Sequence, residues 1–325
     1  MDPKDKLSNT KDQSNSINSS NMFRGLKTAY FIKNILNLLS RKKLLELIKC
    51  NKHLQKLMDV NLNNYKIYHE IYTSIELEVE ANEEGMYGKF INIKDEDKKY
   101  YHIYFNDNKK EEIKRYELNK DDNVSKINII IDHQVKSFSE LFKYSYCTSI
   151  KFKKFYRTNI TDMNYMFYST CFLKELDLTN FNTDSVTDMS YMFCGVPVTE
   201  LNLTKFKTDK VTNMKCMFSG CTKLKELNVT NFNTNNVTNM ISMFCGCSSL
   251  KELNLANFNT DNVTDMEYMF IKCSSLKELN LDNFNIDNVI FMGYMFSGCT
   301  DELKLKIKNK YPNFKNDAYL EYNYN

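Results

Sequence analysis

The chain has 325 residues, of which 42% are hydrophobic, and this is enough for two or three domains with a real core. Its 44 basic and 41 acidic residues give a formal net charge of +3, so the charges nearly cancel and no basic footprint for DNA or RNA emerges. Composition therefore argues against a nucleic-acid partner.

The first twenty residues form a polar segment. Its sizeable apolar side chains are Met1, Leu7 and Ile17, too few to offset the entropy of ordering, so we predict a disordered polar tail over residues 1–20. This segment lacks the apolar core of a secretory signal, and no later stretch reaches the ~18 apolar residues of a membrane span. We therefore expect a cytoplasmic or nuclear protein without a membrane span.

Residues 21–71 have a helical pattern, because apolar residues recur along Leu26–Met58 at helical spacing and Ser40 can cap a second helix. The segment Tyr30–Leu57 resembles an F-box, whose helices dock on the adaptor of a cullin ubiquitin ligase. The resemblance implies ubiquitin-ligase subunits as partners. The docking residues that it implies are Phe31, Ile35, Leu36, Leu39, Leu44, Leu45 and Leu47. The plain alternative is a helical cap with no partner.

Residues 72–130 change to a period of two, which is typical of strands, and clusters of Asn, Asp, Lys and Glu between the apolar runs are typical of turns. We predict a small, mostly antiparallel β region that joins the helices to the rest of the chain. The expected strands are Ile75–Val79, Lys89–Ile93, Tyr100–Phe105, Ile113–Leu118 and Ile127–Asp132.

The remainder of the chain repeats itself. The first methionines of a Met-x-x-Met-Phe core are spaced by 26, 25, 26, 26 and 26 residues, at Met163, Met189, Met214, Met240, Met266 and Met292. Such a period indicates a repeat solenoid, which we place at residues 131–310. An atypical first copy around Phe138–Phe155 caps one end. At the other end we expect a last rung at Leu303, Leu305 and Ile307, and a tail over 311–325 that covers or trails from the array.

Each copy has two halves. In Leu224–Phe232, Leu227 and Val229 point inward and Asn228 outward, as in a short strand that adds to a parallel sheet. In Val237–Phe244 the apolar residues follow a spacing of i, i+3, i+6 and i+7, which predicts a short helix with Thr238 as N-cap.

One cysteine per copy follows the core phenylalanine by three residues. We interpret Cys221, Cys247, Cys273 and Cys299 as a column of small buried thiols, with disulfides or a metal site as the alternatives.

The copies read Leu-x-x-Leu-x-Leu-x-x-Phe, then Val-Thr-x-Met-x-x-Met-Phe-x-x-Cys, and this pattern resembles the BspA-like class of leucine-rich repeats of bacteria and protists. From Thr158 to about Ile307, the resemblance implies a leucine-rich-repeat-type right-handed solenoid of short parallel strands and short helices, within an α+β chain. Ordinary leucine-rich repeats carry Asn or Cys at the ninth position. Here that position holds phenylalanine, so we expect a stacked aromatic spine instead of an Asn hydrogen-bond ladder, at Phe181, Phe206, Phe232, Phe258 and Phe284.

The outward strand positions are the candidate partner-binding face. They form columns of Lys, Glu and Asn or Asp, and they indicate either a protein-binding surface or a solvated sheet whose adjacent columns neutralise each other. Their uniformity argues against a small-molecule pocket. The residues are Lys174, Glu175, Asp177, Glu200, Asn202, Lys225, Glu226, Asn228, Lys251, Glu252, Asn254, Lys277, Glu278 and Asn280.

The sequence carries no hydrolase, kinase or dinucleotide-binding signature, so we expect no enzyme activity, no cofactor and no catalytic or metal-binding residues. The favoured function is a scaffold that holds a protein partner of unknown identity on the concave sheet face. One alternative is an F-box-like substrate receptor of a ubiquitin ligase. The other is a cell-surface adhesin, which the BspA-like resemblance alone suggests.

Overall fold

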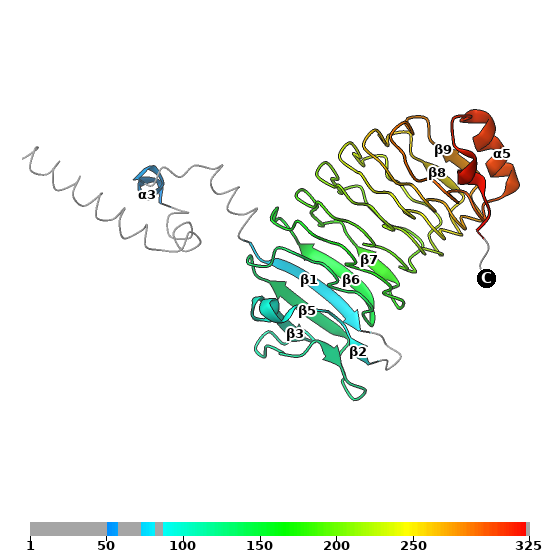
Figure 1. The fold of residues 1–325 in the computed structure, drawn as a ribbon. Helices are drawn as coiled ribbons and strands as arrows, with labels where there is room; N and C mark the ends of the chain where they lie inside the picture. Colours follow the sequence, from blue (N-terminus) through cyan, green and yellow to red (C-terminus); the bar gives the residue numbers. More distant parts are fainter. Residues whose placement is uncertain (1–50, 58–72, 82–86, 323–325) are drawn as a thin grey trace, which may run out of the picture. The chain divides into compact units, whose positions relative to one another are not determined.

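The computed structural model describes residues 51–57, 73–81 and 87–322 (Figure 1). The chain divides into two compact units, Met1–His69 and Glu70–Asn325. In the first unit, the described residues form helix α3 (Lys52–Leu57), whose Leu54 N–H donates to Asn51 Oδ1 at 3.0 Å. The predicted polar tail and all seven F-box-like docking residues lie outside the described residues.

The described part of the second unit is mixed α and β, with sheets and stacked turns predominating and few helices. Its N-terminal portion is a five-stranded sheet with the strand order β3-β5-β1-β6-β7. The first three of these pair antiparallel, and they confirm three of the predicted strands. The strands are β1 (Ile75–Ala81), β3 (Tyr101–Phe105), β5 (Lys126–Ile131), β6 (Cys147–Lys154) and β7 (Glu175–Asp177).

The alternation of apolar and polar residues along the sequence explains why these segments form strands with one buried side. In β5 every second residue, Ile127, Ile129 and Ile131, is fully buried, and the residues between them are half-buried. The other two predicted strands are much shorter than expected: β2 (Gly88–Lys89) pairs with β4 (Glu117–Leu118), and Ile113 forms an isolated bridge with Ile103. A 3₁₀ helix, η1 (Asp95–Tyr100), precedes β3.

Strand β6 joins this sheet to the repeats. It pairs antiparallel with β1 on one side and parallel with β7 on the other, where Ile150 lies opposite Leu176. The ring of Phe142 stacks on Phe167 at 5.8 Å in the same pair of copies. Both contacts place the segment before Thr158 in register with the repeats, which confirms the predicted atypical first copy.

Each repeat forms one coil, and successive coils lie side by side (Figure 1). Isolated parallel bridges connect one residue of each coil to the next, at Ser137, Asp162, Asp188, Asn213, Asn239, Asp265 and Phe291. The strand half of the coil is less regular. Strands there are β7, β8 (Glu252–Asn254) and β9 (Glu278–Asn280), and only the last two pair with each other. Segments 201–203 and 227–229 carry no strand, so the predicted continuous parallel sheet is wrong in the middle of the array.

The predicted short helix of each coil is also wrong. Residues 241–246 form consecutive turns, in which Ser242 has a left-handed φ of 54°. Alternate N–H groups, on Met240, Ser242 and Phe244, donate to carbonyls of the following coil at 2.9–3.1 Å. Between them, the Met243 N–H donates to the Met240 carbonyl at 3.2 Å, and the Ile241 N–H donates to Asn239 Oδ1 at 3.0 Å. The neighbouring coil thus provides acceptors that an isolated helix would have to supply itself, and a stripe at i, i+3 and i+7 suits either arrangement.

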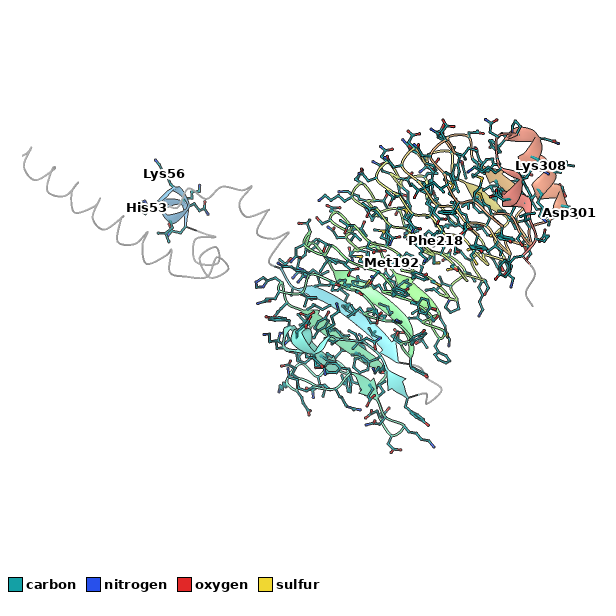
Figure 2. The ribbon with its side chains drawn as sticks, viewed as in Figure 1. His53, Lys56, Met192, Phe218, Asp301 and Lys308 are labelled. Atoms are coloured by element: carbon teal, nitrogen blue, oxygen red, sulfur yellow. The ribbon has the colours of Figure 1, made fainter. Side chains whose placement is uncertain are left out.

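The interior of the coils is built from stacked rings. The core phenylalanines Phe142, Phe167, Phe193, Phe218, Phe244, Phe270 and Phe296 follow one another at 5.6–5.8 Å with interplanar angles of 1–8°. A second column joins Phe181, Phe206, Phe232 and Phe258 at 5.6–6.4 Å, which confirms the predicted aromatic spine at these four positions, while the fifth, Phe284, is half-buried. Met192 and Phe218 are labelled within the array in Figure 2, and both are fully buried.

We predicted that the aromatic spine would replace an asparagine hydrogen-bond ladder. This prediction is wrong, because the structure has both the spine and a ladder. Asn231 Nδ2 donates to the carbonyls of Leu203 and Phe206 in the preceding coil at 3.0 and 2.7 Å, and Asn257 does the same one coil later. The asparagine occupies the position before the phenylalanine. The turn is therefore held by ring stacking and by side-chain hydrogen bonds together.

Residues 301–310 form helix α5 (Asp301–Lys310) in place of the predicted last rung. Thr300 caps it, because its Oγ1 accepts from the Leu303 N–H at 3.2 Å. Leu303 and Ile307 lie one turn apart and are buried, whereas Leu305 is 61% exposed. The buried face of this segment therefore follows the helical spacing i, i+4. It does not follow the strand-like alternation of Leu303, Leu305 and Ile307.

Both ends of the stack are closed by hydrogen bonds. At the C-terminal end, the N–H groups of Tyr294 and Phe296 donate to the carbonyls of Asp317 and Ala318 in the 3₁₀ helix η2 (Asn316–Tyr319), both at 2.9 Å. The ring of Tyr319 lies 5.4 Å from that of Phe296. The part of the tail up to residue 322 thus covers the array, as one of the two expectations had it.

At the other end, Asn92 closes the first coil. Its N–H donates to the Leu141 carbonyl at 2.7 Å, and its Nδ2 donates to the carbonyls of Glu140 and Lys143. None of the helices among the described residues is long and apolar enough to cross a membrane.

Candidate functional site

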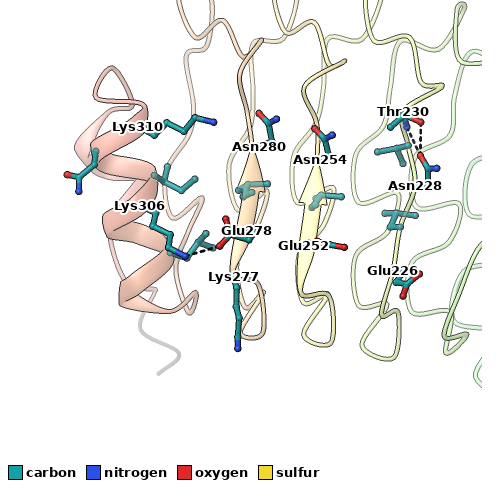
Figure 3. Close-up of a pocket in the computed structure, with 17 residues that line it drawn as sticks. Glu226, Asn228, Thr230, Glu252, Asn254, Lys277, Glu278, Asn280, Lys306 and Lys310 are labelled. Carbon is teal, nitrogen blue, oxygen red and sulfur yellow. Dashed lines mark hydrogen bonds and ion pairs between the residues drawn. The ribbon is translucent and has the colours of Figure 1, made fainter.

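A groove of about 920 Å³ lies over three successive coils, on the outer surface of β8, β9 and the segment 226–230 (Figure 3). Helix α5 closes one end of this groove and contributes Lys306, Asn309 and Lys310 to its lining. We call the outward surface of these strand segments the strand face, and this hollow the groove.

The repeated Glu-Leu-Asn sequence of each coil builds the floor. Strand alternation directs the leucine into the core, where Leu253 is 3% exposed, and leaves Glu252 and Asn254 on the outside. Repetition then lines up like side chains. In Figure 3, Glu226, Glu252 and Glu278 form one row, and Asn228, Asn254 and Asn280 form a second row beside it.

The asparagine row is held in a fixed orientation. Each Oδ1 accepts a hydrogen bond from the backbone N–H two residues later, at Thr230, Ala256 and Asp282, at 3.0–3.1 Å. Because Oδ1 already accepts this hydrogen bond, the Nδ2 group is the part of the amide that points elsewhere and can donate to another group. Among the described residues, the Nδ2 groups of Asn228 and Asn254 have no hydrogen-bond partner, whereas the Asn280 side chain hydrogen-bonds to the Asp282 carboxyl.

The ion pairing of the glutamate row changes along the row. Glu278 Oε1 lies 2.9 Å from Lys306 Nζ, and Lys306 also lies 3.1 Å from Glu302. Glu226 and Glu252 are exposed and have no ion pair among the residues that the structure describes. The row is thus neutralised beside α5 and left acidic away from it.

The lysine column does not neutralise the glutamate column by direct contact. Lys225, Lys251 and Lys277 are exposed, and none has an ion pair in the described ranges. Lys277 lines the groove, and Figure 3 shows its side chain extending away from the asparagine row. A lysine and the glutamate after it point in different directions, because successive residues of an extended chain alternate.

The wall of the groove is fixed by polar contacts between α5 and the last rung. Lys310 Nζ lies 2.8 Å from Asp282 Oδ1, and the Tyr311 hydroxyl donates to the same oxygen at 2.8 Å. The Leu281 N–H in turn donates to the Tyr311 oxygen at 3.0 Å. The hydrogen bond from Lys310, with that from Tyr311, lowers the pKa of the Asp282 carboxyl below its ordinary value.

Seven of the fourteen predicted face residues line the groove: Glu226, Asn228, Glu252, Asn254, Lys277, Glu278 and Asn280. The other seven, Lys174, Glu175, Asp177, Glu200, Asn202, Lys225 and Lys251, lie outside its lining, and Asp177 forms an ion pair with Lys151 at 3.0 Å. The contribution of α5 was not predicted. Its signal was present in the Thr300 cap and in the spacing of Leu303 and Ile307.

The cysteine column lies inside the coils. Cys221, Cys247, Cys273 and Cys299 are buried free thiols, and each Sγ donates to the carbonyl of the core phenylalanine of the preceding coil at 3.0–3.2 Å. Burial raises the pKa of the Cys221 and Cys299 thiols to about 12. The buried-thiol interpretation is confirmed. Among the described residues, no cluster of three His, Cys, Asp or Glu side chains could hold a metal ion.

Stacked coils of one repeated sequence motif make this a tandem-repeat protein. The family model described as "Mycoplasma protein of unknown function, DUF285" matches residues 135–227 and 221–316, which together cover more than half of the chain. The chain therefore belongs to the DUF285 family. It matches no curated protein and no solved structure.

Proposed function

We propose that this protein is a non-enzymatic interaction scaffold that binds a protein partner on the strand face, at the groove closed by α5. One observation carries the proposal. Among the described residues, the groove of about 920 Å³ presents Glu226 and Glu252 without ion pairs, and the oriented Nδ2 groups of Asn228 and Asn254 without hydrogen-bond acceptors.

The uniformity of the rungs favours a long ligand. Small-molecule sites are concave, mostly apolar and marked by a few locally unique polar groups. Here the same Glu-Leu-Asn sequence recurs at 226–228, 252–254 and 278–280, so one contact is offered three times in a row. A ligand that spans several coils can use all three, whereas a small molecule can use only one.

We also propose that the coils form a right-handed solenoid of the leucine-rich-repeat type, of the BspA-like class. The period of about 26 residues, the inward leucines and the coil-to-coil bridges support this. In such solenoids the strand side is the extended surface on which partners are held, which agrees with the position of the groove.

The test is site-specific photo-crosslinking in the cells that make the protein. A photoreactive residue in place of Asn254 lies on the groove, and one in place of Thr238 is equally exposed but belongs to the turn half of a coil. We expect a crosslinked protein from the Asn254 position and none from the Thr238 position. No crosslink at Asn254, or equal crosslinking at both positions, would contradict the proposal.

The F-box-like segment supplies a second candidate, a substrate receptor of a ubiquitin ligase. Helix α3 (Lys52–Leu57) is helical where that resemblance expects a helix. Affinity purification should then recover ubiquitin-ligase subunits with the full chain and lose them when residues 26–58 are deleted. Recovery that does not depend on this segment would refute the receptor role.

A further inference from the structure

The charge of the groove is uneven. Beside α5, Glu278 is paired with Lys306, and Asp282 is paired with Lys310, so acids and bases balance there. One and two coils further into the array, Glu252 and Glu226 line the groove without an ion pair among the described residues. A ligand that complements this surface carries positive charge over these two carboxylates.

The groove also offers hydrogen-bond donors at fixed positions. Asn228 and Asn254 use Oδ1 to accept from their own chain at 3.1 Å, so their Nδ2 groups remain to donate. A row of donors without acceptors is complementary to a row of carbonyl groups, and an extended polypeptide presents such a row along its length. A nucleic acid also presents acceptors, but its phosphates would be repelled by the glutamate row.

The spacing of the row fits alternate residues of an extended chain. Neighbouring rungs of parallel strands lie about 4.8 Å apart, and side chains on one side of an extended peptide recur every ~6.6 Å. The difference of roughly 2 Å is within the reach of the flexible stems of lysine and arginine. Two cationic residues at i and i+2 can therefore face Glu226 and Glu252 at once.

We propose that the groove takes an extended segment of a partner protein, with lysine or arginine at positions i and i+2 over Glu226 and Glu252. The backbone carbonyls of this segment accept from the asparagine row, and α5 stops the segment at one end. This inference rests on the proposed function and specifies the chemistry of the partner.

The first experiment uses the full-length protein and two labelled nine-residue peptides with a neutral background. One peptide carries lysine at positions 4 and 6, and the other carries glutamine there. We expect fluorescence polarisation to show binding of the lysine peptide that is at least tenfold tighter and that weakens as salt is added. Equal binding of the two peptides, or binding of neither, would overturn the inference.

Matched variants locate the contact. Glu226→Lys with Glu252→Lys should weaken binding of the lysine peptide at least tenfold. Glu175→Lys with Glu200→Lys makes the same change of charge in the same column, outside the groove lining, and should change binding less than twofold. An equal loss in both variants would mean that net charge alone, and not the groove, attracts the peptide.

The outcome is separable from the test of the proposed function. Crosslinking at Asn254 without any preference for the lysine peptide would leave the scaffold function standing and overturn the inference about the partner segment. If crosslinking at Asn254 and peptide binding are both absent, both proposals fail.

Discussion

Phe218 offers the most direct test of how the coils are held together. Its side chain, labelled in Figure 2, is fully buried, and its ring stacks on Phe193 and Phe244 at 5.7 Å on either side. Its carbonyl also accepts from the Cys221 N–H and from the Cys247 thiol, at 3.2 Å each. Replacement of this ring by alanine therefore removes contacts to both neighbouring coils and leaves the backbone hydrogen bonds in place.

The expected loss of unfolding free energy is about 3–5 kcal/mol, the usual cost of truncating a buried phenylalanine. Each stacked pair adds about 0.5–1.5 kcal/mol beyond the buried area, so two pairs place Phe218→Ala at the upper end of that range. A domain is stable by about 5–15 kcal/mol in total, so this is a large fraction. Phe218→Leu keeps an apolar side chain and should lie between the wild type and alanine.

The assay is urea unfolding combined with hydrogen exchange resolved by peptide. Coils in a stack contact mainly their neighbours, so protection should fall first in the coils around Phe218, and the amides of β3 and β5 should keep theirs. Phe291→Ala is the matched control, because Phe291 is 54% exposed, and it should change stability by less than about 0.5 kcal/mol. A cost below about 1 kcal/mol for Phe218→Ala, or a uniform loss of protection, would refute the stacking argument.

Three further outcomes are expected. Maleimide should label the exposed Cys171 in the folded protein and leave Cys247 unlabelled until urea unfolds the chain. Burial makes the Cys247 thiol inaccessible and raises its pKa. Rapid labelling of Cys247 without urea would contradict this. NMR titration should give Asp282 a pKa below its ordinary value of 3.8, and Lys310→Gln should raise it; its contribution to stability is complete above pH 3.8 and is lost as the pH falls through the lowered pKa. Asn231→Asp removes two donors to the preceding coil and should cost about 1–2 kcal/mol in urea unfolding, and an unchanged midpoint would show that the ladder contributes nothing.

The periodicity of the sequence was sufficient to predict the stack. A spacing of 25 or 26 residues, repeated from Met163 to Met292, placed the phenylalanine and cysteine columns correctly, because a coil of constant length brings equivalent positions together. The atypical first copy was also predictable from the spacing of its apolar residues.

The backbone of the turn half could not be predicted from the same pattern. A helix and a series of turns both place residues i, i+3 and i+7 on one side, and the side chains at the left-handed positions, Tyr191 and Ser242, carry no glycine signal. What decides the outcome is the next coil, whose carbonyls are acceptors that no single repeat contains.

The sequence predicted the floor of the groove but not its wall. Alternation in Glu-Leu-Asn identified the outward rows correctly, but the wall of the groove comes from α5, where Leu303, Leu305 and Ile307 suggested a strand. Thr300 is a typical N-cap residue and indicates that a helix begins here. This signal is stronger evidence for the structure of residues 301–310 than the alternation of three apolar residues.

The direction of the hydrogen bonds in the turn half has a consequence for assembly. At Met240, Ser242 and Phe244 and at the equivalent positions of other coils, the N–H groups point toward the C-terminal end of the stack. At these positions an open last coil would present donors, and an open first coil would present acceptors. Two such ends are complementary and do not close a ring, which is the geometry of an endless filament. By occupying the acceptors with Asn92 and the donors with η2, the chain terminates its own pattern and keeps one molecule from serving as the template for the next.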